Sequence, residues 1–343
     1  MGMLVEGRWR AEDRIFEDGG FRRQASLFDA PLGPELAESL RRDPGRYCLI
    51  ASLSCPWSHR ALIARALKGL EDTVSLQIAG GRRVEGYAVN GGAFWNVPGG
   101  DRRIVHLHEL YSLSNPSYSG RCTVPLLWDS LRQRIVCNES ARIVRLFDQA
   151  PAVSGHLDFT LRPPHLAGEI DVLNKRLHDE LSNAVYRAGL ARRQDLYEAA
   201  VGEVFAMLDE LEARLEERRY LFGSVLTESD LMLLPTLLRF DSVYHGHFRC
   251  GRRRLVDYPH LWAYARDLFA WCGIAATTDF RIIREGYYLN DGDGNPFGIV
   301  AVAPDANWFL PHGRGRLSAA KVAMRDGTMV EVEPATLTPS GKG

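Results

Sequence analysis

The sequence of 343 residues lacks any long hydrophobic run. No window approaches the roughly 18 consecutive apolar residues that a membrane-spanning helix needs. The amino-terminal stretch MGMLVEGRWRAED also lacks the apolar core of a signal peptide. We therefore expect a cytoplasmic protein with no membrane partner. At roughly 150 residues per domain, the length predicts about two domains.

An excess of charge of either sign is also missing. The chain has 42 Lys and Arg residues against 43 Asp and Glu residues, which gives a net charge of -1. Such a chain has no global field that would attract nucleic acid, so we expect no nucleic-acid partner. The cysteines show no paired CxxC spacing, which argues against a disulfide framework and against a zinc ribbon. They are Cys48, Cys55, Cys122, Cys137, Cys250 and Cys272.

Two histidine pairs are the only motif of the sequence that suggests a metal. His106 with His108, and His245 with His247, are spaced two apart, and four histidines can in principle hold zinc. Neither pair has a fixed carboxylate partner in the sequence. We therefore predict no metal site.

The amino-terminal half shows a strand and helix alternation behind an irregular arm. Residues 1–45 are rich in Gly, Arg and Asp, and we expect them to lie over a domain, anchored by Trp9, Phe16, Phe21 and Phe28. Residues 46–155 then predict a thioredoxin-like domain with the order strand, helix, strand, insertion, strand, strand, helix. The strands are expected at 47–52, 74–78, 123–128 and 134–137, the helices at 56–69 and 139–149, and the insertion at about 80–120.

The carboxyl-terminal half predicts a helical bundle over residues 165–290. Thr227 and Asp230 form the acidic version of a capping box, which marks the start of one helix. Residues 291–343 are expected to form a coil and a polar tail that frays near 330. The fold class is therefore α/β followed by all-α. The helices are expected at 166–189, 195–218, 228–244, 259–271 and 277–286.

Cys55 stands at the predicted turn between the first strand and the first helix. Pro56 begins that helix, so the sulfur should lie near unpaired backbone N–H groups and the positive end of the helix dipole. This setting favours the thiolate, which is the nucleophile in thiol exchange. Ser58 occupies the place where dithiol oxidoreductases carry a second cysteine. A mixed disulfide on Cys55 therefore needs an external thiol, which predicts glutathione or a similar small thiol as cosubstrate and no bound cofactor.

Two further segments are suited to hold a peptide thiol. Pro125 begins a strand after Thr123 and Val124, and a cis peptide there would present the Val124 backbone to an extended peptide. Glu139 and Ser140 lie at a helix amino end, where N–H groups and a hydroxyl can bind a carboxylate while Glu139 accepts from an ammonium group. Together these groups match the amino-acid head of a glutamyl thiol.

At this point the residues resemble a known family. The stretch Ser54-Cys-Pro-Trp-Ser-His-Arg60 is similar to the Cys-Pro-Trp-Ala/Ser-His-Arg motif of glutathionyl-hydroquinone reductases, the omega-like xi-class glutathione transferases. The segments 123–125 and 138–140 resemble their two glutathione-binding segments. The resemblance spans roughly residues 20–305, with further similar motifs at Val185–Gly189, Arg239–Cys250, Gly286–Tyr288, Asn295–Pro296 and Gly298–Val300.

The resemblance implies a fold, a reaction and a set of site residues. The implied fold is a thioredoxin-like domain followed by an all-helical domain, assembled as a homodimer. Cys55 would take glutathione from a glutathionyl-hydroquinone as a mixed disulfide, and a second glutathione would release it. Tyr186, Tyr244 and Tyr287 would assist the leaving hydroquinone.

The sequence also departs from the family pattern. The family usually has Gly-Trp-x-Phe in the insertion, where this chain has Gly92-Ala93-Phe94-Trp95, so that Trp95 is the candidate for the thiol-binding tryptophan. Gly286 stands where the family has a histidine, and Asn290-Asp291 where it has Ser-His.

Four alternatives stay open. The same cysteine chemistry suits a glutaredoxin-like thiol transferase or an omega-like dehydroascorbate reductase. It also suits a related enzyme that uses a different low-molecular-weight thiol. A non-catalytic partner protein similar to glutathione transferases, which keeps their substrate cleft only as a docking surface, would need no cysteine chemistry at all.

Overall fold

The computed structural model describes residues 2–11, 16–21, 25–28, 30–152 and 157–336. The chain divides into two compact units. The first unit comprises Met1–Ile15, Arg22–Pro151 and Thr277–Val300. The second comprises Phe16–Phe21, Ala152–Ala276 and Ala301–Gly343. Among the helices of the described residues, none is both long enough and apolar enough to cross a membrane.

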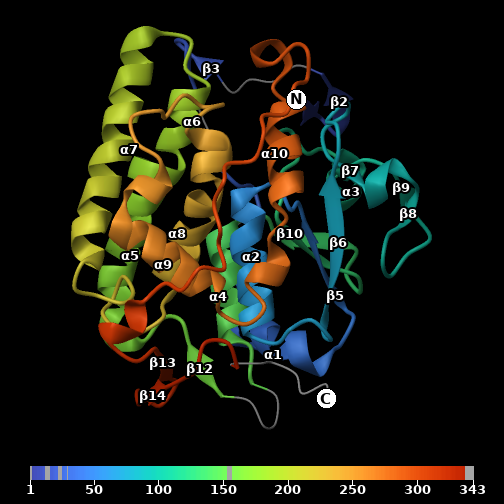
Figure 1. The fold of residues 1–343 in the computed structure, drawn as a ribbon. Coiled ribbons are helices and arrows are strands. Elements are labelled where there is room, and N and C mark those ends of the chain that lie inside the picture. The colour runs from blue at the N-terminus through green and yellow to red at the C-terminus, as the bar shows by residue number, and fades with distance from the viewer. Residues whose placement is uncertain (1, 12–15, 22–24, 29, 153–156, 337–343) are drawn as a thin grey trace. The chain divides into compact units, whose positions relative to one another are not determined.

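The first unit is built on a sheet of five strands in the order β11-β10-β5-β6-β7. All five side chains of β5 are buried, and this continuous apolar run makes it a central strand. β5 pairs parallel to β6 and antiparallel to β10. Helices α2 and α4 pack against each other beside this sheet (Figure 1). The strands are β5 (Tyr47–Ala51), β6 (Val74–Gly80), β7 (Ala88–Val89), β10 (Leu126–Asp129) and β11 (Arg134–Cys137), and the helices are α2 (Pro56–Leu67) and α4 (Ser140–Gln149).

The region predicted as an insertion, 80–120, contains regular structure. Besides β7, it holds the hairpin β8 (Trp95–Asn96) and β9 (Arg103–Ile104), the short helix η1 (Asn90–Gly92) and helix α3 (Leu107–Ser114). Leu107, Leu110 and Tyr111 are buried on one side of α3. The helical spacing of these residues was present in the sequence, but the surrounding glycine pairs concealed it.

The expectation of an irregular arm over residues 1–45 is also wrong. The structure has two hairpins there, β1 (Met3–Val5) with β2 (Arg8–Arg10) and β3 (Phe16–Glu17) with β4 (Gly20–Phe21), followed by helix α1 (Pro34–Arg42). The rings of two predicted anchors do contact the first unit. Trp9 stacks on His108 with ring centroids 4.7 Å apart, and Phe28 contacts Tyr111 at 5.6 Å. The side chain of Phe16 lies outside the described residues.

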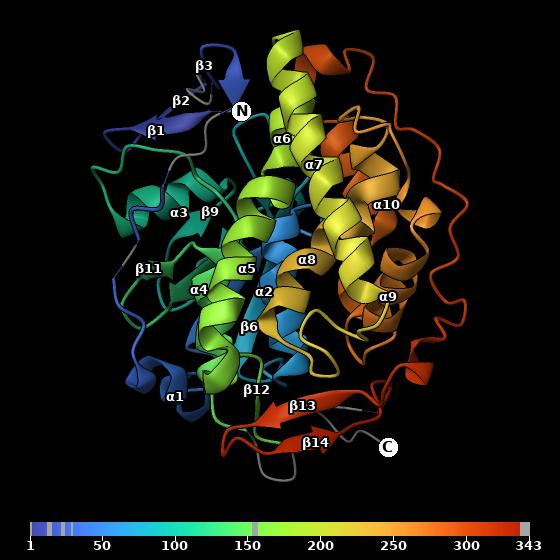
Figure 2. The same cartoon turned by 90° about the vertical axis from the view of Figure 1, so that its left-hand side faces the viewer.

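The second unit is mainly helical, and Figure 2 shows α7 alongside α6 and α9. The predicted capping box of α8 is present: the Thr227 N–H donates to Asp230 at 2.8 Å, and its hydroxyl donates at 2.9 Å. The α-helices are α5 (Ala167–Arg176), α6 (Ala184–Gly189), α7 (Gln194–Leu215), α8 (Glu228–Arg239) and α9 (Pro259–Phe269). The 3-10 and π-helical turns are η2 (Pro164–Leu166), η3 (Leu177–Ser182), η4 (Phe240–Tyr244), η5 (Leu255–Asp257), η8 (Arg314–Arg316) and η6 (Ala275–Thr277), whose last residue belongs to the first unit.

Two corrections concern the carboxyl-terminal third. Helix α10 (Phe280–Tyr288), which we expected in the helical bundle, belongs to the first unit, as does η7 (Gly292–Gly294). The expected coil contains strands β13 (Lys321–Met324) and β14 (Met329–Glu331), which form a sheet with β12 (Phe159–Thr160). Pairing with β12, far away in sequence, gives these strands their backbone partners. The end of the predicted tail, residues 337–343, lies outside the described residues.

Candidate functional site

Cys55 is the N-cap residue of α2, directly before Pro56. The Cys55 N–H donates to the carbonyl of Ser52 at 3.1 Å, and the Cys55 carbonyl accepts from the N–H of His59 at 3.0 Å. The thiol points to the carbonyl oxygen of Val124, with a sulfur-to-oxygen distance of 3.6 Å. The residue is 7% exposed. The structure thus places the sulfur at the amino end of a helix, where the helix dipole favours negative charge.

The other residues of the motif shape the turn that carries Cys55. Ser58, at the position of the missing second cysteine, accepts a hydrogen bond from the Ser52 N–H at 3.1 Å. Ser52 and Ser54 pair through their hydroxyls, also at 3.1 Å. The Arg60 guanidinium lies over the ring of Trp57, 4.4 Å from its centroid. Sequence reasoning used Ser58 only as the place of a missing second cysteine and assigned no role to the other side chains, because each acts through a contact within the folded turn.

Tyr111 joins the two segments that were predicted to bind a peptide thiol. Its hydroxyl donates to the Thr123 carbonyl at 2.8 Å and accepts from the Thr123 N–H at 3.1 Å. It also accepts from the side-chain amide of Asn138 at 3.0 Å. One donor and two lone pairs are therefore all satisfied on a fully buried side chain. Burial raises the pKa of Tyr111, which keeps the phenol neutral.

Sequence reasoning missed Tyr111 because it lay in the supposed insertion. The arm reinforces the same connection, since the hydroxyl of Ser26 pairs with the side-chain oxygen of Asn138 and the Phe28 ring meets the Tyr111 ring edge-on. The helical spacing of Leu107, Leu110 and Tyr111 is a sequence signal that could have identified Tyr111 in advance, and the structure shows all three buried on α3.

The predicted thiol-binding backbone has the expected local geometry. The Val124–Pro125 peptide is cis. Glu139 is the exposed N-cap of α4, and its side chain makes no hydrogen bond to the helix. Ser140, the first helical residue, is buried. The first turn of α4 therefore lacks a side-chain cap from Glu139, and its N–H groups suit an incoming carboxylate.

Trp95 is not brought to this group of residues by any described contact. Its backbone pairs with Ile104 in the β8–β9 hairpin, which extends away from α2 at the edge of the first unit (Figure 1). Its role in thiol binding stays a prediction.

The three predicted tyrosines fall in different units. Tyr287 lies on α10 in the first unit, next to Gly286. Tyr186 and Tyr244 lie in the second unit with their ring centroids 6.1 Å apart. Phe248 packs against both, at 5.3 Å from Tyr186 and 5.5 Å from Tyr244. Tyr244 is fully buried, whereas Tyr186 is partly exposed.

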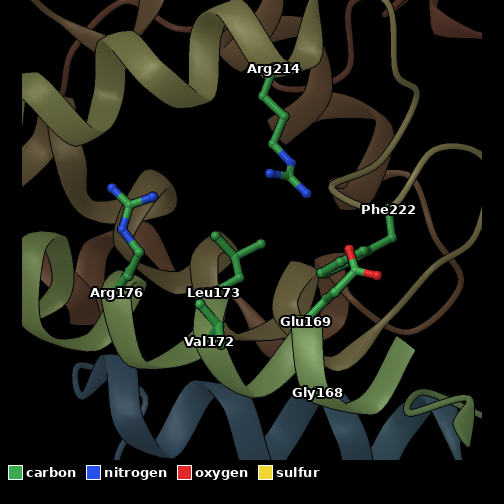
Figure 3. A pocket seen from close by; sticks show the side chains of 7 residues that line it. All are labelled: Gly168, Glu169, Val172, Leu173, Arg176, Arg214 and Phe222. Carbon is green, nitrogen blue, oxygen red and sulfur yellow. The ribbon is translucent and has the colours of Figure 1, made fainter. Parts of the chain in front are cut away.

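A hollow of about 490 Å³ in the second unit contains none of the predicted site residues. Figure 3 shows Arg214 reaching into it from α7 and Glu169 from α5. Arg214 already donates to the carbonyl of Leu221 at 2.8 Å and lies over the Phe222 ring. Arg176 pairs with Glu180 and Glu210. Because the guanidinium groups of Arg176 and Arg214 already have partners within the second unit, we assign no site to this hollow.

Comparison with known proteins identifies the family. Residues 54–150 match the Glutathione S-transferase, N-terminal domain, and residues 194–267 match the Glutathione S-transferase, C-terminal domain. The chain is 40% identical over 327 residues to the glutathionyl-hydroquinone reductase YqjG of Escherichia coli, covering 92% of this chain and 98% of the relative. It is also 40% identical to the glutathionyl-hydroquinone reductase PcpF of Sphingobium chlorophenolicum, covering 89% and 96%.

The chain belongs to the glutathionyl-hydroquinone reductase family of enzymes. The glutathione-bound structure of the Escherichia coli homologue superposes with a TM-score of 0.77 at 38% identity, covering 92% of this chain and 99% of that one. The family resemblance and the fold class expected from the sequence are therefore confirmed.

Loss of solvation disfavours the thiolate form of four other cysteines of this family member. It raises the pKa of Cys250 to about 12, and it also raises the pKa of Cys48, Cys122 and Cys137. At neutral pH these four thiols stay protonated and therefore weakly nucleophilic.

We expect iodoacetamide at pH 7 to alkylate Cys55 at least tenfold faster than Cys48 or Cys250, because alkylation requires the thiolate. Quantitative peptide mass spectrometry would measure the rates, with partly exposed Cys272 as an internal reference. Raising the pH toward 12 should increase labelling of Cys250. Equal rates for Cys55 and Cys250 at pH 7 would contradict the placement of the sulfur.

Proposed function

We propose that this protein removes glutathione from glutathionyl-hydroquinones, using Cys55 as the nucleophile and a second glutathione as reductant. The observation that carries the proposal is the position of the Cys55 sulfur, at the amino end of α2 and 3.6 Å from the Val124 carbonyl oxygen. The names of the relatives at 40% identity support the same reaction.

The chemistry balances in two steps. The Cys55 thiolate attacks the thioether sulfur, so that a sulfur–sulfur bond forms and the sulfur–carbon bond to the ring breaks. The electron pair of that bond stays on the ring carbon, which takes up one proton and becomes free hydroquinone. A second glutathione thiolate then attacks the mixed disulfide, giving glutathione disulfide and the Cys55 thiolate. The ring carbon is reduced by two electrons, and the two glutathione sulfurs, the thioether sulfur of the substrate and the thiol of the second glutathione, are oxidised to the disulfide.

Glutathione would be held by the two segments that Tyr111 connects. The backbone of Val124 would pair with the peptide portion of glutathione as an added strand does. The first turn of α4, with Ser140, would accept the carboxylate of the γ-glutamyl group, and the exposed Glu139 carboxylate would accept from its ammonium group. The glutathione-bound structure of the Escherichia coli homologue supports this choice of thiol.

Tyrosine hydroxyls would supply the proton and stabilise the developing charge. We assign this role to Tyr186, Tyr244 and Tyr287. The contact between Tyr186 and Tyr244 supports a common role for these two, since a change at one ring alters the packing of the other.

A glutaredoxin-like thiol transferase is the second candidate. It is favoured by the geometry at Cys55 and Ser58, which suffices for exchange with an external disulfide. Such exchange needs no proton donor for a carbon leaving group, and the two candidates therefore differ in their need for tyrosines.

The mixed disulfide is directly observable. Incubation with glutathionyl-menadiol should add one glutathione to Cys55 and release menadiol, detected by intact-protein and peptide mass spectrometry. Cys55→Ser should lose both the adduct and at least about a thousandfold in turnover, as expected when a nucleophile is removed. Cys272→Ser is the matched control and should keep both. An adduct on another cysteine, with Cys55→Ser still active, would refute the mechanism.

Tyr186→Phe distinguishes the two candidate functions. For the reductase we expect a loss of about 10²-fold or more in kcat on glutathionyl-hydroquinone, because the ring carbon must be protonated, with disulfide exchange changed less than threefold. Tyr197→Phe serves as control, since that hydroxyl binds the Arg249 carbonyl instead. Equal losses in the two assays would favour the thiol transferase.

Tyr111→Phe tests the thiol-binding segments. The variant removes three hydrogen bonds while keeping the ring, so we expect KM for glutathione to rise about tenfold with a smaller change in kcat. Steady-state kinetics with varied glutathione would measure this. The control is Tyr118→Phe, because the Tyr118 hydroxyl donates to the Arg121 carbonyl and not to Thr123 or Asn138. An unchanged KM in Tyr111→Phe would rule out this connection as a determinant of binding.

The homodimer and the cytoplasmic location expected from the sequence stay proposals. The family resemblance supports a homodimer, which sedimentation velocity would detect. The absence of a membrane-spanning helix among the described residues is compatible with the expected cytoplasmic location.

A further inference from the structure

The segment that leads into helix α10 contacts the motif that carries Cys55. Before α10 begins, the hydroxyl of Thr277 lies 2.9 Å from the ring nitrogen Nε2 of His59, and the hydroxyl of Thr278 lies 3.3 Å from the same nitrogen. His59 is fully buried and lies one helical turn after Cys55. Residues 277–300, which belong to the first unit, therefore contact the motif that holds Cys55.

Gly286 makes the closest approach between α10 and this turn. A β-carbon built on Gly286 would lie 2.2 Å from the β-carbon of Ser54 and 2.5 Å from its hydroxyl oxygen. Carbon atoms in contact are normally about 3.5–4.0 Å apart. Only a residue without a side chain can hold the helix this near to Ser54, which immediately precedes Cys55.

Asn290 anchors the other end of the helix. Its side-chain oxygen accepts from the N–H of Arg83 at 2.7 Å, and its amide donates to the carbonyl of Gly81 at 3.3 Å. The same amide also donates to the Gly286 carbonyl at 3.0 Å. Both ends of α10 are thus attached, and the helix cannot simply pivot away if Gly286 gains a side chain.

We propose that α10 sets the position of the nucleophile, and that Gly286 is a positioning residue that acts through Ser54 on Cys55. This inference rests on the proposed role of Cys55. Gly286 stands where the family resemblance expects a histidine, and a histidine side chain would not fit beside Ser54 at this distance. With any larger residue, the helix and the turn must separate by about 1.5 Å to reach ordinary contact distance.

A displacement of this size matters for the reaction. Shifting a reacting group by about 1 Å can cost about 10²-fold in rate. The sulfur of Cys55 would move relative to the Val124 carbonyl and the segments expected to hold glutathione. The glutathione segments themselves, 123–125 and 138–140, are held by Tyr111 and would stay in place. The loss should therefore appear in kcat more than in KM for glutathione.

The test compares Gly286→Ala with the compensating double variant Gly286→Ala/Ser54→Gly. Alanine has a higher helix propensity than glycine, so α10 itself should not be weakened. In the single variant we expect kcat on glutathionyl-menadiol to fall by about 10–100-fold with KM for glutathione within threefold. Alkylation of Cys55 by iodoacetamide should slow by at least fivefold. Removing the Ser54 side chain should restore both quantities to within about threefold of the parent.

Three controls make the comparison specific. Gly202→Ala is the matched helix substitution, since nothing lies within 4 Å of a β-carbon there, and it should change neither rate. Ser54→Gly alone gives the baseline for the double variant. Asn290→Ala removes the hydrogen bonds at the far end of α10 without adding volume, and it should also lower kcat. This variant tests the attachment of α10 even if Gly286→Ala does not fold.

The outcomes separate this inference from the proposed function. Unchanged alkylation and turnover in Gly286→Ala, or an unrescued loss in the double variant, would overturn the positioning role. Alkylation does not use the substrate. If the parent protein shows a reactive Cys55 but no turnover of glutathionyl-menadiol, the proposed function fails, and the alkylation rates still decide on Gly286.

Discussion

The placement of one sulfur atom at the amino end of α2 is the constraint on which the rest of the site depends. A helix end is a useful electrostatic setting only if the sulfur stays there, and a strand-to-helix turn has few contacts of its own. The turn is therefore held from within by the Ser52 and Ser58 hydrogen bond and faces Val124 across the site. α10 adds an attachment from outside through His59 and Gly286.

A second set of contacts holds the backbone segments that are proposed to bind glutathione. Tyr111 connects Thr123 to Asn138 with all its hydrogen-bonding capacity used, and it is shielded by Phe28 of the arm. None of these Tyr111 hydrogen bonds involves Ser52 or Ser58, so a substitution at Tyr111 leaves the hydrogen bond between Ser52 and Ser58 intact. If the two segments bind glutathione as proposed, kinetic constants for binding and for turnover would therefore report on different residues.

Local signals predicted much of this arrangement and long-range contacts did not. β5, α2 and α4 were predictable because a buried strand shows a short apolar run and a helix start shows typical residues, such as Pro56 after Cys55. Both signals lie within a few residues of the element itself. Tyr111 and Gly286 were not assigned these roles, since each acts on a segment that is distant in sequence. The same reason explains the strands β13 and β14, which acquire their role only by pairing with β12. A single sequence does not record such partners.

The division of the chain also distinguishes among the three candidate tyrosines. Tyr287 belongs to the same compact unit as Cys55, on a helix attached at Thr277, Gly286 and Asn290. Packing within that unit therefore governs its separation from the sulfur. Tyr186 and Tyr244 belong to the other unit, where Phe248 packs against both rings. The surroundings of the three tyrosines are therefore fixed by different means: for Tyr287 by a helix attached at three places, and for Tyr186 and Tyr244 by the packing of aromatic rings.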